Sequence, residues 1–562
     1  MNILGLNYFF HDSTASILQD GKLLIAIEEE RLIRRKHTVE FPARSAKKCM
    51  DVCGMTPSDI HAIAVSIKPS LNAPAKILHG LRRPREGRPF LAIELSAYRA
   101  RKASLEKWYR STWPEEKRRP PIHFIPHHLC HAPGTFLVSP YESAALLSID
   151  GSGEWASAYF GRAEGRKIER YSETYFPHSL GAFYEAVTEF CGFRTNYDEG
   201  KTMGLAPYGD PKVFYSIVKN MVRVNDDLTF EIDLSYFNHQ YWGTPRCSPK
   251  FHEVFGRPRK ASEPFEDRHH DAAAAFQRVL EESVLELCRQ LKKRSKAKHL
   301  VIGGGVALNS VMNGRLVRES GFDDLYVMPA AGDNGTGIGA STYLYHVEQG
   351  HPRSFVHLDP YVGTSYSDAE IKKALDEGKL KPERLDDPAA TGAEILHQGQ
   401  ILGWFQGRME IGPRALGNRS ILADPTRPDM KDKINAEVKH REAFRPFAPS
   451  VIVEKRSEYF EIEVEDPFML KVCYVRPDQR HALPAITHVD GTARLQTVQK
   501  DVNPLYYQLM SELGKRNGIP VVLNTSFNVM GEPIVESPFD AIRCFYSTGL
   551  DALIMGNYLL RK

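Results

Sequence analysis

The sequence predicts an α/β protein whose N-terminal part holds two copies of one β-rich plan. The first copy reads "NILGLNYF", "TASILQD" and, after the Asp-Gly turn at 20–21, "KLLIAIEEE", and such apolar runs joined by short turns are typical of a β-meander. The second copy reads "AALLSID", "WASAYFG" and "KIERYSE" over residues 144–173. Each copy carries an acidic residue in its first loop, Asp12 or Asp150. Duplicated lobes that face one another across a cleft are one interpretation, and two coincidental β-hairpins are the other.

The elements that follow alternate helices with glycine-rich loops. A helix is predicted over 179–193, and "NYDEGKTMGLAPYGD" (196–210) is rich in glycine. A longer helix is expected to begin near Asp271 as its N-cap, because apolar residues recur at helical spacing after it: Phe276, Leu280, Val284 and Leu287. Residues 299–316 and 324–341 each read as strand, glycine-rich turn and helix.

A domain junction is predicted around 346–362, where "HVEQGHPRSFVHLDPYV" breaks the preceding helix and carries two prolines. The predicted domains are therefore 1–350 and 351–562. The second is also α/β, with "TGAEILHQG" as a helix and "QILGWFQG", "FAPSVIV" and "IPVVLNTSF" as strands. A chain of 562 residues is too long for a single core, which agrees with two domains.

Composition narrows the class of protein. The chain is 42% hydrophobic and 25% charged with a net charge of +3, so it reads as globular, and nothing in its charge demands a nucleic-acid partner. Basic runs at 81–89 and 98–121 favour a solvated face over a polyanion groove. Eight scattered cysteines without a CxxC pair fit free thiols in the cytoplasm. The sequence shows neither a secretory signal nor an apolar run long enough to span a bilayer, so no membrane partner is expected.

The stretch "HHLCH" raises the question of a metal site. His127 and His131 lie four residues apart, a spacing that about one pair would show by chance among 21 histidines. Asp150 ends an apolar run and so must be paired or metal-bound, and Asp333 lies in the Gly-rich "AAGDNGTGIG", where an Asx-turn is the alternative. Two imidazoles and two carboxylates suit Fe²⁺, Mn²⁺ or Zn²⁺ with open positions. His128, Cys130 and His123 are expected to have structural roles.

Other motifs suggest phosphate chemistry. "GGGVALN" (303–309) follows a buried strand and opens a helix, so its backbone N–H groups either contact a nucleotide or form a packing turn. Arg414, Arg445 and Arg494 each lie among small or apolar neighbours. One such arginine is usually a structural ion-pair partner, but three together favour a site for a phosphoryl ligand. "NTSFN" (524–528) adds amide and hydroxyl groups after a buried strand.

These motifs together resemble one family. "LGLNYFFHDSTASILQDG", "HHLCHA", "SIDGSGEW", "DEGKTMGLAPYG", "GGGVALN", "GDNGTGIGA", "GPRALGNRSILADP", "REAFRPFAPS" and "LNTSFNVMGEPIV" occur in the order found in the O-carbamoyltransferases, which include antibiotic and Nod-factor carbamoyltransferases. The resemblance implies a duplicated actin/sugar-kinase-like (ASKHA) domain followed by a YrdC-like α/β domain. It also implies that the second domain makes carbamoyl-adenylate from carbamoyl phosphate and ATP, and that the first transfers the carbamoyl group to a hydroxyl of a small acceptor at a metal site.

The resemblance assigns roles by motif. His127, His131, Asp150 and Asp333 match Fe²⁺ ligands, and His11 matches the proposed general base. Mg²⁺ is expected to accompany ATP. The remaining matches hold the adenylate in the transfer site, namely Lys36, Gly181, Gly305 and Asn309, or hold carbamoyl phosphate and ATP, namely Arg414, Lys439, Arg445, Arg494, Asn524 and Ser526. The first loop, "NYFFHD", is shorter than in some aminoglycoside-specific members, which argues against their acceptor.

Three alternative functions agree less well with the sequence. An ASKHA-class phosphotransferase or ATPase shares the duplicated loops, but it leaves the histidine pair and the arginine-rich second domain unexplained. A threonylcarbamoyl-type tRNA modification enzyme shares both, yet the near-neutral charge gives no sign of a tRNA footprint. A non-catalytic regulator would have lost a metal ligand or His11. A monomer and a homodimer are both compatible with the sequence.

Overall fold

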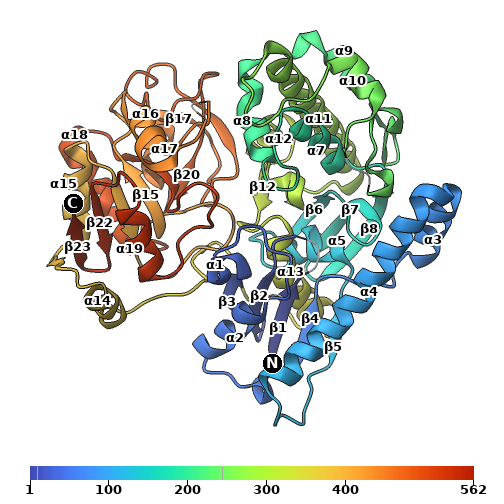
Figure 1. The fold of residues 1–562 in the computed structure, drawn as a ribbon, viewed down its shortest axis with the longest axis horizontal. Coiled ribbons are helices and arrows are strands. Elements are labelled where there is room, and N and C mark those ends of the chain that lie inside the picture. Colours follow the sequence, from blue (N-terminus) through green and yellow to red (C-terminus); the bar gives the residue numbers. More distant parts are fainter. Residues whose placement is uncertain (9–10, 243–244, 443) are drawn as a thin grey trace. The chain divides into compact units, whose positions relative to one another are not determined.

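The computed structural model describes residues 1–8, 11–242, 245–442 and 444–562, with only the backbone described at 101 and 102. The chain forms two compact units (Figure 1). Unit 1 comprises Met1–Glu29 and His37–His357, and unit 2 comprises Glu30–Lys36 and Leu358–Lys562. The main division therefore falls after His357, and a short early segment belongs with the later unit, which no sequence pattern indicated.

Unit 1 is built on two sheets with the same topology. The first contains β1 (Asn2–Asn7), β2 (Thr14–Gln19), β3 (Lys22–Glu28), β4 (Ala62–Val65) and β5 (Ile122–Phe124), in the order β3-β2-β1-β4-β5. The second contains β6 (Ser143–Ile149), β7 (Ala156–Glu164), β8 (Lys167–Tyr175), β11 (His299–Gly303) and β12 (Asp324–Val327), in the order β12-β11-β6-β7-β8. In both, three antiparallel strands are followed by two parallel ones. The predicted duplication is confirmed, because chance hairpins would not share five strand positions.

The two halves exchange helices. Helices α5 (His127–Cys130) and α6 (Ala132–Phe136) follow β5 of the first sheet, yet α6 packs on β6 and β11 of the second. Helix α13 (Thr336–Tyr343) follows β12 of the second sheet and packs on β1, β2 and β4 of the first. The helices from the two halves therefore meet each other between the sheets.

Glycines allow this meeting. A Cβ atom on Gly339 of α13 would lie 1.8 Å from the carbonyl oxygen of Cys130, and one on Gly134 of α6 would lie 2.5 Å from the Cα of Gly339. Gly5 of β1 similarly faces the carbonyl oxygen of Gly337. Because any side chain would collide with backbone here, the helices approach more closely than alanine would permit.

The helices of the second half differ in detail from the sequence expectation. Helix α11 spans Asp267–Ser295, so the prediction that Asp271 is its N-cap is wrong. The N-cap is Glu266, whose backbone N–H donates to Nδ1 of His269, a reciprocal cap that a search for Asp, Ser or Thr misses. Asp271 instead accepts a hydrogen bond from the backbone of Asp210. The Gly-rich 196–210 segment contains helix α8 (Glu199–Leu205), and helices α7 (Leu180–Phe190) and α12 (Ser310–Glu319) lie where helices were expected.

Between β4 and β5 the chain forms α3 (Ala73–Arg82) and α4 (Pro84–Thr112), which we call the arm. The two helices pack against each other. Gly87 fits only as glycine, since a Cβ there would lie 1.7 Å from the carbonyl oxygen of Gly80.

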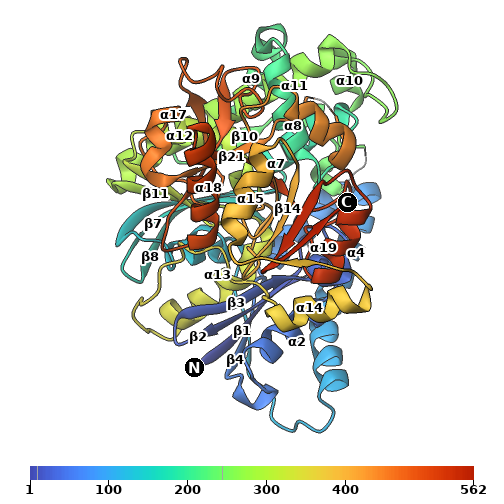
Figure 2. The same cartoon turned by 90° about the vertical axis from the view of Figure 1, so that its left-hand side faces the viewer.

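Unit 2 is a mixed sheet covered on both faces. Its eight strands run in the order β13-β23-β22-β14-β15-β21-β16-β20. In that order they span Glu383–Arg384, Tyr558–Arg561, Ala552–Met555, Leu402–Phe405, Arg419–Ala423, Val521–Ser526, Ala448–Ile452 and Gln496–Val498. Helices α15 (Pro388–His397) and α18 (Pro504–Asn517) lie side by side (Figure 2) and share one core with Trp404 of β14 (Leu402–Phe405). A second core includes residues of α14 (Asp368–Glu377), α16 (Met430–Ile434) and α19 (Pro538–Tyr546). The Glu30–Lys36 segment joins this unit because Arg31 donates to the carbonyl of Gly412 and Arg34 to that of Ile534.

The structure bears on the expectations about membrane spans and cysteine pairing. Among the described residues no helix is long and apolar enough to cross a bilayer. All eight cysteines are unpaired.

Replacing Gly339 with alanine should destabilise the protein. The new methyl group has no room against the carbonyl of Cys130, and overpacking of this kind costs about 1–3 kcal/mol. We expect a lower melting temperature by calorimetry. The matched control is Gly200→Ala in α8, where nothing lies within 4 Å of the new Cβ, so it should leave the melting temperature unchanged or raise it. Equal melting temperatures for the two variants would contradict the role given to the crossing.

Candidate active site

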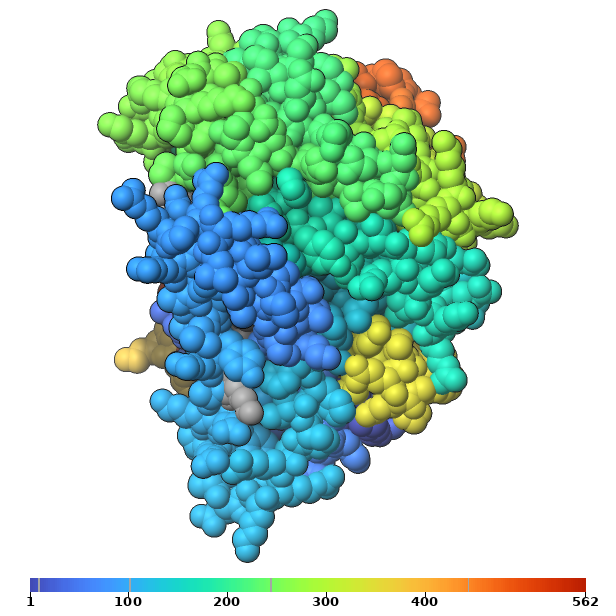
Figure 3. Space-filling model, turned by 90° about the vertical axis from the view of Figure 1, so that its right-hand side faces the viewer, coloured from blue at the N-terminus to red at the C-terminus, as the bar shows by residue number. Residues whose placement is uncertain are grey.

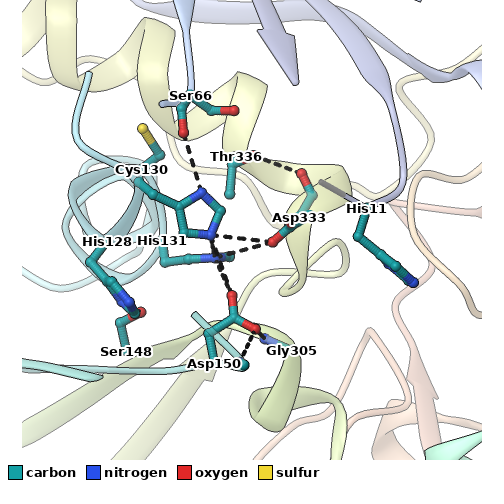
Figure 4. A network of polar contacts seen from close by, with 12 residues as sticks. His11, Ser66, His128, Cys130, His131, Ser148, Asp150, Gly305, Asp333 and Thr336 are labelled. Carbon is teal, nitrogen blue, oxygen red and sulfur yellow. Dashed lines mark hydrogen bonds and ion pairs between the residues drawn. The ribbon is translucent and has the colours of Figure 1, made fainter. Parts of the chain in front are cut away.

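Four side chains from distant parts of unit 1 meet at one point (Figure 4). His127 and His131 come from the α5 region, Asp150 directly follows β6, and Asp333 lies in the loop before α13. One ligand atom from each lies within 4.8 Å of all the others. The structure therefore brings together the four predicted metal ligands.

Their spacing suits a single ion. Nε2 of His131 lies 3.0 Å from Nε2 of His127 and 2.9 Å from Oδ2 of Asp150. Nε2 of His127 lies 3.4 Å from Oδ2 of Asp150 and from Oδ1 of Asp333. Ligand atoms ~2.1 Å from one ion are ~3.0–3.4 Å apart at right to tetrahedral angles, so one divalent cation fits among these atoms.

Hydrogen bonding also orients a nitrogen lone pair toward this point. Nδ1 of His127 lies 3.2 Å from the carbonyl oxygen of Ser66, which accepts its proton. Nε2 is then the nitrogen that can bind a metal in place of a proton, and it faces the two carboxylates. The backbone N–H of His127 donates to Glu154, 3.0 Å away, which fixes the start of α5.

The charge of the cluster favours a bound cation. The histidine side chains are only 1% exposed, whereas those of Asp150 and Asp333 are 15% and 11% exposed. Burial lowers the pKa of His127, but the charges of Asp333 and Asp150 and the bonds to them outweigh it and raise that pKa well above its ordinary value. Burial acts oppositely on Asp150, and its bonds from both histidines hold its pKa well below the usual range. The four side chains thus retain a proton, or a metal in its place.

His128 and Cys130 have structural roles, as expected. His128 bonds the hydroxyl of Ser148 and the carbonyl of Ala156, at 2.7 and 2.8 Å. Burial and the neighbouring His127 lower its pKa to about 3, so it stays neutral. Burial raises the pKa of the Cys130 thiol well above its usual value, and its Sγ lies 3.4 Å from the carbonyl oxygen of Pro126.

His11 is held by Asp12 and Asn196. Its Nδ1 lies 2.9 Å from Oδ2 of Asp12, and its Nε2 donates to the carbonyl oxygen of Asn196. His37 bonds the other oxygen of Asp12 at 2.7 Å. Burial lowers the pKa of His11, but Asp12 outweighs it and raises the value to about 10. In this arrangement His11 is a charged donor at both nitrogens.

This histidine arrangement depends on unusual backbone. Asp12, His37 and Asn196 have φ of 47°, 53° and 61°, the left-handed region that non-glycine residues rarely adopt. The sequence indicates Asp12 only as an acidic loop residue. It does not indicate His37 or Asn196, because no spacing rule links residues so far apart. Strain of this kind gathers at functional sites.

Two of the positions expected to hold the adenylate, Gly181 and Gly305, lie beside Asp150. The N–H of Gly305 donates to Oδ1 of Asp150 at 3.3 Å, and Gly181 packs against the backbone of Asp150. Asn309 caps α12 and exchanges two amide hydrogen bonds with Gln277. Lys36 is exposed and belongs to unit 2, directly before His37 of unit 1, and its role stays a prediction.

In unit 2, arginine side chains converge. Arg494 lies in β19 (Thr492–Arg494). Burial is the largest cause that lowers its pKa, and the positive charges of three neighbours lower it further, namely Arg414, Arg441 and Arg445. Burial and Arg445 lower the pKa of Arg414 to about 10. Within the described residues, Nε of Arg414 and Nε of Arg494 are buried without a hydrogen-bond acceptor. Such an excess of donors and positive charge suits a phosphate-bearing anion. Arg441 was missed, although it lies in the "KHREAFRP" motif.

Three other residues are predicted to hold carbamoyl phosphate and ATP. Lys439 and Asn524 are buried, and Ser526 is half-buried. Lys439 donates to Ser526 and to Asn528, and burial holds the pKa of Lys439 well below its usual value. The amide nitrogen of Asn524 donates to Ala415, Ser450 and Gln496, while its buried Oδ1 has no described partner. Asp466 is the acidic group beside Arg414 and Arg494, and burial raises its pKa to about 6.

Comparison with known families now decides the class. The family model described as carbamoyltransferase N-terminus matches residues 2–342, and the one described as carbamoyltransferase C-terminus matches residues 393–562. The chain belongs to the carbamoyltransferase family. It is therefore an enzyme, and the resemblance predicted from its motifs is confirmed.

Two relatives cover nearly the whole carbamoyltransferase chain, and a third covers about two thirds of it. An uncharacterized protein of Synechocystis sp. is 39% identical over 100% of this chain and 97% of its own. The nodulation protein NolNO of Sinorhizobium fredii is 38% identical over 99% of this chain and 80% of its own. The 3'-hydroxymethylcephem-O-carbamoyltransferase of Amycolatopsis lactamdurans is 31% identical over 64% of each chain.

Metal binding by the four-residue cluster is directly measurable. After chelator treatment, the carbamoyltransferase should take up about one Fe²⁺, Mn²⁺ or Zn²⁺ per chain, measured by elemental analysis after dialysis. Asp333→Asn removes a charged ligand and should weaken binding at least ~100-fold. His123→Gln is the control, since His123 has the same four-residue spacing to His127 but lies outside the cluster. Equal metal content in both variants would contradict the assignment.

The charge state of His11 should depend on Asp12. In Asp12→Asn the pKa of His11 should fall from about 10 toward its ordinary value of about 6.5, because the carboxylate that outweighs burial is gone and only the smaller contributions of Asp333 and the Asn196 carbonyl still raise it. The histidine ring signal, assigned with His11→Gln, reports this by NMR titration. A raised histidine pKa adds stability that is complete below about pH 6.5 and is lost as pH rises through about 10, so the Asn variant should lose stability at neutral pH. An unchanged titration would show that another group holds the charge.

Proposed function

We propose that this carbamoyltransferase is an ATP-dependent O-carbamoyltransferase in which unit 2 forms carbamoyl-adenylate and unit 1 transfers its carbamoyl group. The buried set of His127, His131, Asp150 and Asp333 carries the proposal. A kinase or ATPase built on the same duplicated sheets has no need of two imidazoles among its carboxylates. Relatives whose names specify O-carbamoyl transfer support it further.

The first proposed step forms carbamoyl-adenylate from carbamoyl phosphate and ATP. Loss of phosphate from carbamoyl phosphate by water leaves carbamate. A carbamate oxygen attacks the α-phosphorus of ATP, and pyrophosphate leaves, which gives the mixed anhydride. Arg414, Arg441, Arg445 and Arg494 would neutralise the charge that gathers on phosphate and pyrophosphate. The like charges of Arg414, Arg441 and Arg445 around the buried Arg494 support this role.

The second step transfers the carbamoyl group to an alcohol. A cation held by the four-residue cluster would supply Lewis-acid polarisation of the carbonyl or phosphoryl oxygen. The N–H of Gly305, now 3.3 Å from Asp150, lies at a loop suited to the adenylate phosphate. AMP leaves as the alcohol oxygen bonds to the carbamoyl carbon.

His11 would accept the alcohol proton from its neutral form. In that form Asp12 accepts the Nδ1 proton and Nε2 carries the lone pair. Nε2 now faces the carbonyl of Asn196, which requires a proton on Nε2. We therefore propose that the acceptor hydroxyl takes the place of the Asn196 carbonyl at this nitrogen. The acceptor class is a small hydroxylated molecule.

The decisive measurement is pyrophosphate release by the whole chain. It should require both ATP and carbamoyl phosphate, and Arg494→Ala should lower its rate about 100-fold. Arg476→Ala is the control, because Arg476 is a half-exposed arginine paired with Asp478. Release that ignores carbamoyl phosphate would favour the ATPase alternative.

His11→Ala separates the two steps. It should keep pyrophosphate release and abolish carbamoylation of an acceptor, as followed by mass spectrometry for one added carbamoyl group. Loss of both activities in a folded variant would show that His11 does not act in transfer alone.

A further inference from the structure

Helix α3 of the arm exposes apolar side chains and buries polar ones. Ile77, Leu78 and Leu81 point outward and are 51%, 57% and 64% exposed. On the opposite side, Lys76, His79 and Gly80 are buried. A helix on the surface of a globular protein normally shows the reverse pattern, so the outward face of α3 is suited to an apolar environment.

The exposed apolar residues gather on the arm. Among the described residues, eight leucines and isoleucines are exposed, and five of them lie in α3 and α4. These are Ile77, Leu78, Leu81, Ile93 and Leu95. Figure 3 shows the arm (blue) uncovered along this face of the molecule. Single exposed leucines need no explanation, but a cluster of this kind marks an interaction surface.

The arm is also strongly basic. Residues 73–112 contain ten lysines and arginines against three glutamates, a net charge of +7 on a chain whose total is +3. Arg82, Arg83, Arg85 and Arg88 are exposed at the turn from α3 into α4. Basic and apolar groups therefore lie next to each other at the end of the hairpin.

The hairpin is held firmly in this orientation. Nζ of Lys76 lies 2.7 Å from Oε2 of Glu94, which ties α3 to α4. The ring of His79 stacks on Tyr241 with centroids 4.5 Å apart, and its Nε2 donates to the carbonyl of Gln240. Because the polar groups of α3 have their partners on the inner side, the helix cannot rotate its leucines inward without breaking these contacts.

We propose that the arm docks on an anionic membrane surface, with Ile77, Leu78 and Leu81 inserted at the headgroup level and the arginines on lipid phosphates. Interfacial helices combine apolar residues with lysines and arginines in this way, and anionic lipids attract clustered basic groups. A second copy fits less well, because a symmetric interface would bring two +7 surfaces together. The proposal is independent of the proposed function.

The sequence by itself predicts no membrane contact for the arm. The charge run alone favoured a solvated helical face without a membrane partner, because nothing in the sequence shows which side of α3 faces outward. Only the structure turns Lys76 inward and Leu78 outward.

Flotation of the full chain with vesicles tests the proposal. One set contains phosphatidylcholine alone, and the other contains phosphatidylcholine with about 30% phosphatidylglycerol. We expect the chain to float with the anionic vesicles and at least tenfold less with the neutral ones. Added salt should weaken binding, since it screens the arginines.

Two sets of variants separate the contributions. Leu78→Ser with Leu81→Ser should lower vesicle binding at least tenfold and leave binding to heparin unchanged. Arg82→Glu, Arg83→Glu and Arg85→Glu together should abolish both. The matched controls change exposed residues elsewhere in unit 1: Val213→Ser with Ile217→Ser, and Lys293→Glu with Arg294→Glu. Circular dichroism and melting temperature verify folding.

Several outcomes would overturn the proposal. Equal binding to neutral and anionic vesicles, or none to either, would exclude an anionic surface. Arginine variants that lose binding while the leucine variants keep it would indicate a soluble polyanion instead. A dimer in light scattering that the leucine substitutions dissociate would assign the face to a second copy.

Discussion

The close crossing of α6 and α13 is the constraint on which unit 1 depends. Gly134 and Gly339 let the two helices touch through their backbones, and each helix packs on the sheet of the other half. The crossing fixes α5, with His127 and His131, beside the loop that carries Asp333. Asp150 reaches the same point from β6, beside Gly181 and Gly305. The four predicted metal ligands are thus placed by glycines that bear no functional group.

Each unit accumulates charge of one sign that its own residues do not balance. In unit 1, the carboxylates of Asp150 and Asp333 face Nε2 of two histidines, and the set holds a proton or a cation in its place. In unit 2, Arg414 and Arg494 lie beside Asp466, and Arg441 and Arg445 lie beside Glu442, so the arginines outnumber the carboxylates that face them and the set suits an anion. Such arrangements cost folding free energy, since buried like charges repel. They agree with a chain that stabilises highly charged substrates only when these are bound.

Much of the fold was predictable because apolar period and turn residues act locally. The six strands of the two meanders and the helix of 179–193 follow from such patterns, and the shared strand order confirms their duplication. Local patterns could not distinguish Arg414 from Arg419. Arg419 is fully buried and its Nη1 donates to the backbone carbonyls of Gln406 and Asn418, whereas Arg414 lies beside the charged groups Arg445 and Asp466. They also missed Arg441, since one more arginine in a basic motif carries no signal of its direction.

The sequence by itself determined the family and the residue types of both sites, because long motifs specify chemistry wherever they lie in space. Only the tertiary structure decided which of these residues meet. It joined His127, His131, Asp150 and Asp333, tied His11 to Asp12 and Asn196, and turned the apolar side of α3 outward. The reason is physical: helix exchange, backbone contact at glycine and left-handed backbone at Asp12 depend on residues far apart in the chain, and a local pattern contains no information about them.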